Sequence, residues 1–226
     1  MPSTGRFKAV LFDLGGTLIK TLEPPVVFKR ILREHGIDVS LDEIAHAHEA
    51  NGQEFDAEEM AKCEPNFWVR ANSRLLERLG IQGDRELLVK KIDELWWKYD
   101  ELKAYPDAKN TLIQLRSKGL KLGVVTNAFR KEFEEHLDKL GLAKLFDIIV
   151  GVDDCRKAKP SREIFLHAVD QLGVRPEETL FVGDSIKHDF EGAESAGLKP
   201  LLIVRNKKGP MSVKTIRSLA EVLRYV

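Results

Sequence analysis

Polar side chains suited to chemistry occur in four separated stretches, each at the end of an apolar run. The four stretches hold Asp13 with Thr17, Thr126 with Asn127, Lys159 with Pro160, and Gly183-Asp184-Ser185 with Asp189. A charged group at the end of a buried strand must be solvated, paired with an opposite charge or bound to a metal ion. Because such groups recur at strand ends, the sequence predicts one crevice in which carboxylates and a lysine meet.

The elements that would position these groups are short apolar strands alternating with helices. The runs at 9–14, 120–128, 146–154, 179–185 and 200–206 are apolar and partly β-branched, as in "AVLFDL" and "TLFVGDS". Helical spacing follows at 107–119, 131–142, 161–173 and 188–197, each ending near a glycine. Alternation of this kind is typical of an α/β fold, here a doubly wound, mostly parallel Rossmann-like sheet.

Residues 21–100 differ, because they contain no strand-like run and almost continuous helical patterning. We therefore expect a core domain from residues 1–20 and 101–226, with 21–100 inserted as an α-helical cap domain. Since the insertion follows the first strand directly, it would lie as a lid over the carboxyl ends of the strands, where ligands bind in such folds.

The order and spacing of the four stretches resemble the haloacid dehalogenase-like (HAD) hydrolase superfamily, in its branch with a helical cap after the first motif. The segments "AYPDAKNTLIQLRSKGLKLGVVTN" and "VGDSIKHDFEGAESAGLKPLLI" are also similar to the family's connecting segments, so the resemblance covers nearly the whole chain. Taken singly, an aspartate after a strand is more often a helix cap or turn residue. Four motifs in order, with the insertion at the expected place, are far harder to obtain by chance.

The resemblance implies an Mg²⁺-dependent phosphatase acting on a small phosphorylated metabolite. Asp13 would attack phosphorus and form an aspartyl-phosphate, while Asp13, Asp184 and the backbone carbonyl of Gly15 would bind Mg²⁺. Thr126 and the backbone of Asn127 would bind phosphoryl oxygens, and Lys159 would neutralise charge on Asp13 and the phosphate. Asp189 would bind the metal through water or orient Lys159, and Thr17 would support the loop through its hydroxyl.

Gly15 departs from the family pattern, in which the residue two after the nucleophile is an aspartate that serves as general acid and base. A positioned acid or base contributes about 10² to 10⁴ in rate. Three interpretations follow: a phosphohydrolase with another acid or with good leaving groups such as acyl or aryl phosphates, a 2-haloacid dehalogenase, or a degenerate protein that binds a phosphorylated ligand or partner without turnover. We favour the first, because both acidic positions of "GDSIKHD" are retained and dehalogenation does not need them.

Other residues have weaker claims on chemistry. His46 and His48 are two apart on a predicted helix and therefore face different directions, and we expect His188 at the surface. The aromatic residues Phe67, Trp68, Trp96 and Trp97 are expected to pack inside the cap. Candidates for a replacement acid are Glu23, Glu54, Asp56 and Glu58.

Composition excludes several classes of function. Lys+Arg and Asp+Glu both number 36, giving a net charge of zero and no electrostatic reason to expect nucleic acid or a membrane surface as partner. The sequence shows no signal peptide and no apolar run of membrane-spanning length, so we expect a cytoplasmic protein. The two cysteines, Cys63 and Cys155, are expected to be ordinary thiols. The sequence leaves the oligomeric state open.

Overall fold

The structure is a computed structural model that describes residues 7–205 and 213–226. The chain divides into two compact units. One, the core unit, is formed by Met1–Lys20 and Lys103–Val226, and the other, the helical unit, by Thr21–Leu102. None of the helices in the described part of the chain has the length and apolar character that a membrane crossing requires.

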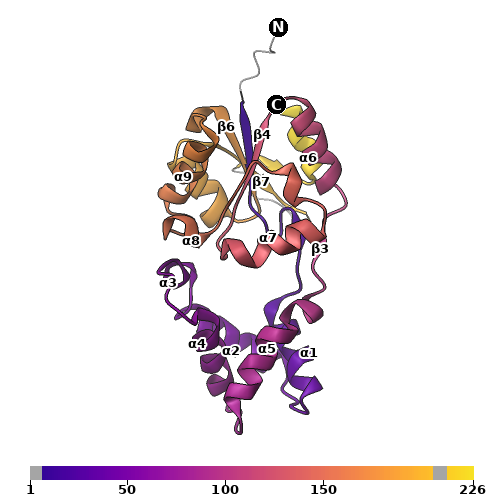
Figure 1. The fold of residues 1–226 in the computed structure, drawn as a ribbon, viewed down its shortest axis with the longest axis vertical. Coiled ribbons are helices and arrows are strands. Elements are labelled where there is room, and N and C mark those ends of the chain that lie inside the picture. Colours follow the sequence, from indigo (N-terminus) through magenta and orange to yellow (C-terminus); the bar gives the residue numbers. More distant parts are fainter. Residues whose placement is uncertain (1–6, 206–212) are drawn as a thin grey trace. The chain divides into compact units, whose positions relative to one another are not determined.

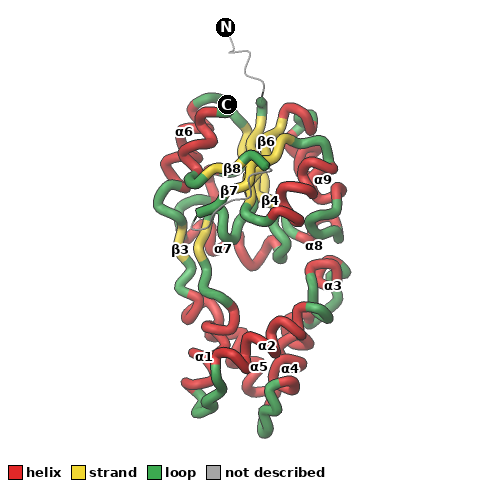
Figure 2. Tube along the Cα trace, turned by 180° about the vertical axis from the view of Figure 1, so that it is seen from behind, coloured by secondary structure: helices red, strands yellow, loops and turns green. Residues whose placement is uncertain are grey.

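The core unit is built on a parallel sheet, which has six strands in the described residues (Figure 2). Its order is β5-β4-β1-β6-β7-β8, and all neighbours pair in parallel. The strands are β1 (Ala9–Phe12), β4 (Lys121–Val125), β5 (Ile148–Val150), β6 (Thr179–Gly183), β7 (Lys199–Ile203) and β8 (Thr215–Ile216). The predicted α/β fold with a doubly wound, Rossmann-like sheet is thereby confirmed.

Strand β1 lies inside the sheet because all four of its side chains are apolar and fully buried. Phe12 is in register with Val124 of β4 on one side and with Val182 of β6 on the other. The chain therefore builds the sheet outward from β1 in both directions, which makes the carboxyl end of β1 the switch point where ligands bind in such sheets.

Helices cover both faces of this sheet, with α9 and α6 on opposite sides of it in Figure 1. On the α9 side, the ring of Phe165 packs edge-on against Phe181 of β6 with the centroids 5.0 Å apart. The α-helices of the core unit are α6 (Ala108–Ser117), α7 (Arg130–Lys139), α8 (Val152–Cys155), α9 (Arg162–Leu172) and α10 (Gly192–Ser195). Shorter helical turns are η1 (Ala143–Leu145), η2 (Pro176–Glu178), η3 (Ile186–Glu191) and η4 (Leu219–Arg224).

Several local features differ from the sequence-based expectation, among them the edge strand β8, which was not expected. The helix expected over 188–197 is instead a π-helical turn, η3, followed by the single turn α10. A two-stranded antiparallel ribbon, β2 (Ile19–Lys20) with β3 (Lys103–Ala104), was not expected and connects the core unit to the residues of the helical unit. The strand predicted over 200–206 ends at Ile203, and Asn206 lies outside the described residues.

The helical unit, all of which the structure describes, contains five helices around its own apolar core. Their starts follow local rules: α1 begins with two prolines, and Ser40 and Glu43 form a capping box at α2. Trp96 packs edge-on against Phe28 in the core, with ring centroids 5.0 Å apart. The helices are α1 (Pro24–Glu34), α2 (Leu41–Gly52), α3 (Ala57–Ala61), α4 (Phe67–Arg78) and α5 (Arg85–Asp100).

Candidate active site

The site begins at Asp13, the residue that follows β1. Its backbone N–H donates to the carbonyl of Val182 at 2.8 Å, which extends the pairing of β1 with β6 by one residue. The residue is buried, with only 7% of its surface exposed. A buried carboxylate at a strand end needs a partner, and the structure supplies one from a distant part of the chain.

That partner is Lys159, which lies in the loop before α9 and is 3% exposed. Its Nζ is 2.6 Å from Asp13 Oδ1 and 2.6 Å from Asp189 Oδ1. The second oxygen of Asp189 accepts from the backbone N–H of Ser185 at 2.9 Å. Because both oxygens of Asp189 have donors, the arrangement favours the expected role of this residue in orienting Lys159.

A third carboxylate, that of Asp184, completes an acidic group at the carboxyl ends of β1 and β6. Asp13, Asp184 and Asp189 each have a carboxylate oxygen, and these three atoms lie within 4.8 Å of one another. Burial raises the pKa of the Asp13 carboxyl, Lys159 opposes the rise, and the charges of Asp189 and Asp184 add to it, giving a pKa of about 7. Burial by itself would lower the pKa of the Lys159 amine, but attraction by Asp13 and Asp189 outweighs it and holds that pKa above its usual range.

Two glycines allow these carboxylates to approach the backbone. Gly16 has a φ of +73°, and a Cβ atom there would lie 2.3 Å from Asp184 Oδ2. At Gly183, a Cβ atom would lie 2.4 Å from Cγ of Asp189. Since real Cβ atoms do not come so close, neither position accepts a side chain while the acidic group keeps this geometry.

Gly15 is different. It is exposed, and its φ does not lie in the left-handed region. A Cβ atom at this position would meet no atom of the described residues within 4 Å. Therefore neither the backbone conformation nor the packing requires a glycine where the family pattern has an acid.

The expected phosphate-binding pair follows β4. Thr126 is 5% exposed, and its backbone N–H donates to the carbonyl of Val150 at 2.9 Å. The side chain of Asn127 holds the backbone of Lys159 at two points: Oδ1 accepts from Lys159 N at 2.6 Å, and Nδ2 donates to Lys159 O at 2.9 Å. The structure thus joins the Thr-Asn stretch to the lysine loop, although it was the backbone of Asn127 that the sequence singled out.

His188 was expected at the surface, yet it is half-buried and contacts the same loop. Its Nδ1 is 3.0 Å from the carbonyl oxygen of Lys159. Its backbone N–H donates to Oγ of Ser185 at 3.1 Å, which fixes the start of η3. No sequence pattern predicts this contact, because it depends on the π-helical turn that contains His188.

Thr17 supports the loop in another way than expected. Among residues 7–205 and 213–226, its buried Oγ1 has no hydrogen-bond partner. Its carbonyl oxygen instead accepts from the guanidinium of Arg205 at 2.5 Å. Arg205 also donates to both carboxylate oxygens of Asp107 at 3.0 Å and lies 3.6 Å from the ring centroid of Tyr105. The arginine therefore ties the residues before β2 to those after β3.

Comparison with known proteins shows the family to which the chain belongs. The family model described as haloacid dehalogenase-like hydrolase matches residues 7–197, which include every site residue named above except Arg205. The chain belongs to the haloacid dehalogenase-like hydrolases. The expected resemblance to this superfamily, and the expectation of a HAD-like hydrolase, are confirmed.

Named relatives of this HAD-like hydrolase include phosphatases. It is 33% identical over 205 residues to glyceraldehyde 3-phosphate phosphatase of Methanopyrus kandleri, covering 88% of this chain and 85% of the relative. It is 33% identical over 198 residues to phosphoglycolate phosphatase of Aquifex aeolicus, covering 86% and 84%. A crystal structure of a HAD phosphatase from Thermococcus onnurineus aligns with a TM-score of 0.65 at 30% identity, covering 96% of this chain and 97% of that one.

The candidate acids of this HAD-like hydrolase outside the core unit have other contacts or stand in solvent. Glu54 accepts from Arg78 at 2.8 Å and from Arg74 at 3.3 Å. Asp56 caps α3 by accepting from Glu59 N at 2.8 Å. Glu58 is exposed, and Glu23, at the start of α1, is exposed too. No geometry inside the helical unit singles out one of the four as an acid.

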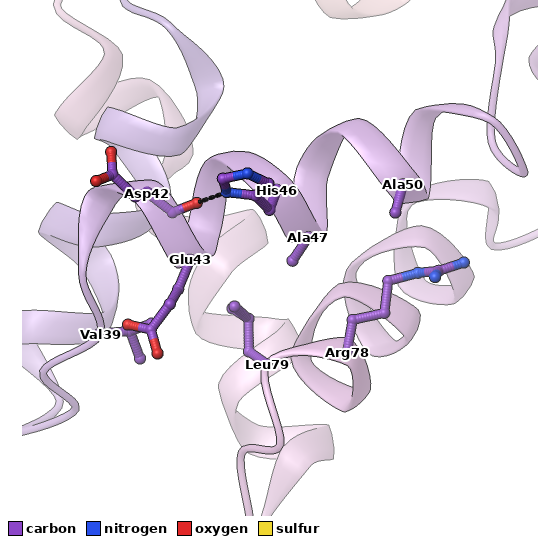
Figure 3. Close-up of a pocket in the computed structure, with 8 residues that line it drawn as sticks. All are labelled: Val39, Asp42, Glu43, His46, Ala47, Ala50, Arg78 and Leu79. Atoms are coloured by element: carbon purple, nitrogen blue, oxygen red, sulfur yellow. Dashed lines mark hydrogen bonds between the residues drawn. The ribbon is translucent and has the colours of Figure 1, made fainter.

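The histidines of the helical unit differ in their surroundings. His48 is half-buried against Phe28, with ring centroids 6.2 Å apart, and burial lowers its pKa while Glu23 opposes the shift. His46 is exposed, and its Nδ1 is 2.7 Å from the carbonyl oxygen of Asp42. His46 lines an open groove of about 640 Å³, and Figure 3 draws the side chains around it. The groove is lined by Val39, Asp42, Glu43, His46, Ala47, Ala50, Arg78 and Leu79.

The aromatic residues of the helical unit only partly follow the expectation of interior packing. Phe67 is 4% exposed, and Trp96, although only half-buried, packs against the apolar core, as expected. Trp97 is half-buried. Trp68, however, is 41% exposed beside Phe67, so its ring stands largely on the surface of the unit.

Proposed function

We propose that this HAD-like hydrolase is an Mg²⁺-dependent phosphohydrolase that acts on small phosphorylated metabolites through an aspartyl-phosphate intermediate. The observation that carries the proposal is the buried contact of Lys159 Nζ with Asp13 and Asp189, next to a third carboxylate. A lysine in that position can neutralise both the nucleophile and an incoming phosphoryl group. The names of the relatives, two phosphatases of small metabolites, support the same class of substrate.

The acidic group fits a divalent cation. Three carboxylates face one lysine, so the group retains negative charge that a cation would balance. Its donors are all oxygens, which are the ligands that Mg²⁺ prefers. Asp13, Asp184 and the carbonyl of Gly15 are the residues we propose as ligands, and bound Mg²⁺ would supply positive charge to the phosphoryl oxygens.

The chain's own residues account for the covalent steps. A carboxylate oxygen of Asp13 attacks phosphorus, and the bond from phosphorus to the leaving oxygen breaks with its electron pair going to that oxygen. Water then attacks phosphorus, the bond to Asp13 breaks, and the proton released by water balances the one that the leaving group takes up. Thr126, the backbone of Asn127 and Lys159 would hold the phosphoryl oxygens during both displacements.

The leaving group is where Gly15 matters. Without an aspartate at this position, the departing oxygen must leave as a stable anion or take its proton from water or from another acid. We therefore propose that substrates with good leaving groups, such as acyl and aryl phosphates, are turned over more readily than simple alkyl phosphates, unless a carboxylate of the helical unit replaces the acid.

We further propose that residues 21–100 form a helical cap domain and that residues 1–20 and 101–226 form the core domain. Two observations support it: both ends of the helical unit join the β2–β3 ribbon, and β2 begins only six residues after the nucleophile. Exchanging exposed side chains of the unit, such as Trp68, should then change KM among substrates of different size. Unchanged KM values across a series of such exchanges would contradict a cap.

The test of the function is a screen of chemically diverse phosphomonoesters with Mg²⁺, using Asp13→Asn as the blank. We expect phosphate release that the blank lacks and that a chelator abolishes until Mg²⁺ is restored. Absence of turnover with every ester, in a folded protein that still binds Mg²⁺, would favour the degenerate binding protein. Halide release from 2-haloacids without metal would favour the dehalogenase.

A further inference from the structure

Two neighbouring residues of one segment bind Lys159, one at its side-chain amine and the other at its backbone carbonyl. Asp189 accepts from Nζ at 2.6 Å, and His188, the residue before it, contacts the backbone carbonyl of Lys159 at 3.0 Å. The π-helical turn η3 presents both side chains to the same lysine. π-Helical turns are rare and are frequently found at functional sites.

The contact between His188 and the carbonyl of Lys159 can be a hydrogen bond in one direction only. A carbonyl oxygen only accepts, so Nδ1 of His188 must carry the proton in this contact. Asn127 Nδ2 donates to the same oxygen at 2.9 Å. The two donors come from the segments that follow β6 and β4, so the carbonyl of Lys159 is the point where both segments meet.

Precision at this point matters because the lysine side chain is long. Four rotatable bonds separate its Nζ from its backbone, and both carboxylates it bridges are buried. A backbone that shifts by a fraction of an ångström must be followed by a change of rotamer or by a longer ion pair. Asn127, which follows β4, binds both the backbone N–H and the backbone carbonyl of Lys159. His188 is the residue that binds this carbonyl from η3.

We propose that His188 is a positioning residue, which acts by donating from Nδ1 to the carbonyl of Lys159 and so fixes the lysine that neutralises the phosphoryl group. The role of the lysine rests on the proposed function. The contact itself lies entirely within the core unit and involves neither a metal ligand nor a titration. The proposal predicts that loss of the Nδ1 donor of His188 weakens the binding of the phosphoryl group by Lys159, although the lysine itself is still present.

The experiment compares His188→Asn with His188→Phe. Asparagine places an N–H donor where Nδ1 stands, whereas phenylalanine keeps the ring and loses the donor. His46→Phe is the matched control, because Nδ1 of His46 also contacts a backbone carbonyl, that of Asp42, in the helical unit (Figure 3). The readouts are kcat and KM for p-nitrophenyl phosphate, thermal midpoints, and calorimetric affinity for inorganic phosphate in the presence of Mg²⁺.

We expect His188→Phe to lower kcat and to weaken phosphate binding by about fivefold to tenfold, the usual consequence of losing one hydrogen bond to a buried group. His188→Asn should stay within about twofold of the parent, since the donor is retained. His46→Phe should change neither quantity. A shared loss in both His188 variants, or no loss in His188→Phe, would overturn the proposal.

Failure of the proposed function has a different signature. Turnover that survives Asp13→Asn, or no turnover in the parent, would refute the aspartyl-phosphate phosphatase. In either case the ratio of phosphate affinities between His188→Asn and His188→Phe still decides whether the histidine positions Lys159, because that measurement needs no reaction.

Discussion

Replacing Gly15 by aspartate should raise the activity of this hydrolase on alkyl phosphates more than on aryl phosphates. The site accepts the change, because a Cβ atom at Gly15 meets nothing of the described residues within 4 Å and the backbone there is not left-handed. The new carboxyl would stand two residues after Asp13, where the family pattern has its general acid and base. Nearby carboxylates would raise the pKa of the new group and so favour its protonated, proton-donating form.

The magnitude follows from what a positioned acid contributes. General acid catalysis adds about 10² to 10⁴ in rate, and an acid installed in an unadapted loop should reach the lower end. A gain of about 10² in kcat/KM on alkyl phosphates corresponds to about 2.7 kcal/mol of transition-state stabilisation. Aryl phosphates leave as stabilised anions and need little protonation, so their rates should change by less than about threefold.

The assay measures phosphate release from glycerol phosphate and from p-nitrophenyl phosphate in parallel, with Mg²⁺ at saturation. Gly15→Asn is the matched control, since it adds the same volume and polarity without a proton to transfer at neutral pH. Adding Asp13→Asn to Gly15→Asp gives the blank. Equal gains on both esters, a loss on both, or an equal gain in Gly15→Asn would refute the reasoning that a missing acid limits the parent enzyme.

Three further outcomes follow from the contacts of single side chains. Lys159→Met leaves two buried carboxylates without their cation, so the free energy of unfolding should fall by about 3 to 5 kcal/mol, and Mg²⁺ should restore part of the loss. Thermal melts with and without Mg²⁺ measure this change, and an unchanged midpoint would contradict the prediction. Burial depresses the pKa of His48 below 6.5, so folding favours its neutral form and the helical unit should lose stability as the pH falls through 6.5. His48→Gln should flatten that loss in urea titrations between pH 7 and 5, and equal slopes for both proteins would refute the account. Arg205→Lys should cost about 1 to 3 kcal/mol, because lysine replaces neither the paired contact with Asp107 nor the stacking on Tyr105; an unchanged urea midpoint would argue against this anchor.

The sheet could be predicted because its central strands are buried on both faces and therefore consist mostly of apolar residues. Ala9–Phe12 and Thr179–Gly183 illustrate this, since every residue of both strands is buried. The ribbon of β2 and β3 and the edge strand β8 have only two residues each in the structure, which is too short to leave a pattern. The sequence predicts an ordinary helix where the structure has the π-helical turn η3, because nothing in the residue pattern separates the two forms.

The candidate site was predicted in part for the same reason. Asp13, Thr126 and Asp184 directly follow strands, so the topology alone brings them to one edge of the sheet. The contacts that hold Lys159 could not be predicted: Asn127 and His188 bind its backbone from 32 and 29 residues away. Hydrogen bonds of this kind depend on loop geometry, which a single sequence does not reveal. The hydroxyl of Thr17 was assigned a role that its carbonyl fulfils through Arg205.

The two adjacent glycines that follow Leu14, Gly15 and Gly16, differ in whether they tolerate a side chain. Position 16 is closed, because any side chain would collide with Asp184 and displace a carboxylate of the acidic group. Position 15 is open, so under the proposed mechanism one substitution there could add or remove the general acid while Asp13 and Lys159 stay in place. If the proposed mechanism holds, the range of leaving groups can change by evolution or by design without any change in the residues proposed to bind the phosphoryl group.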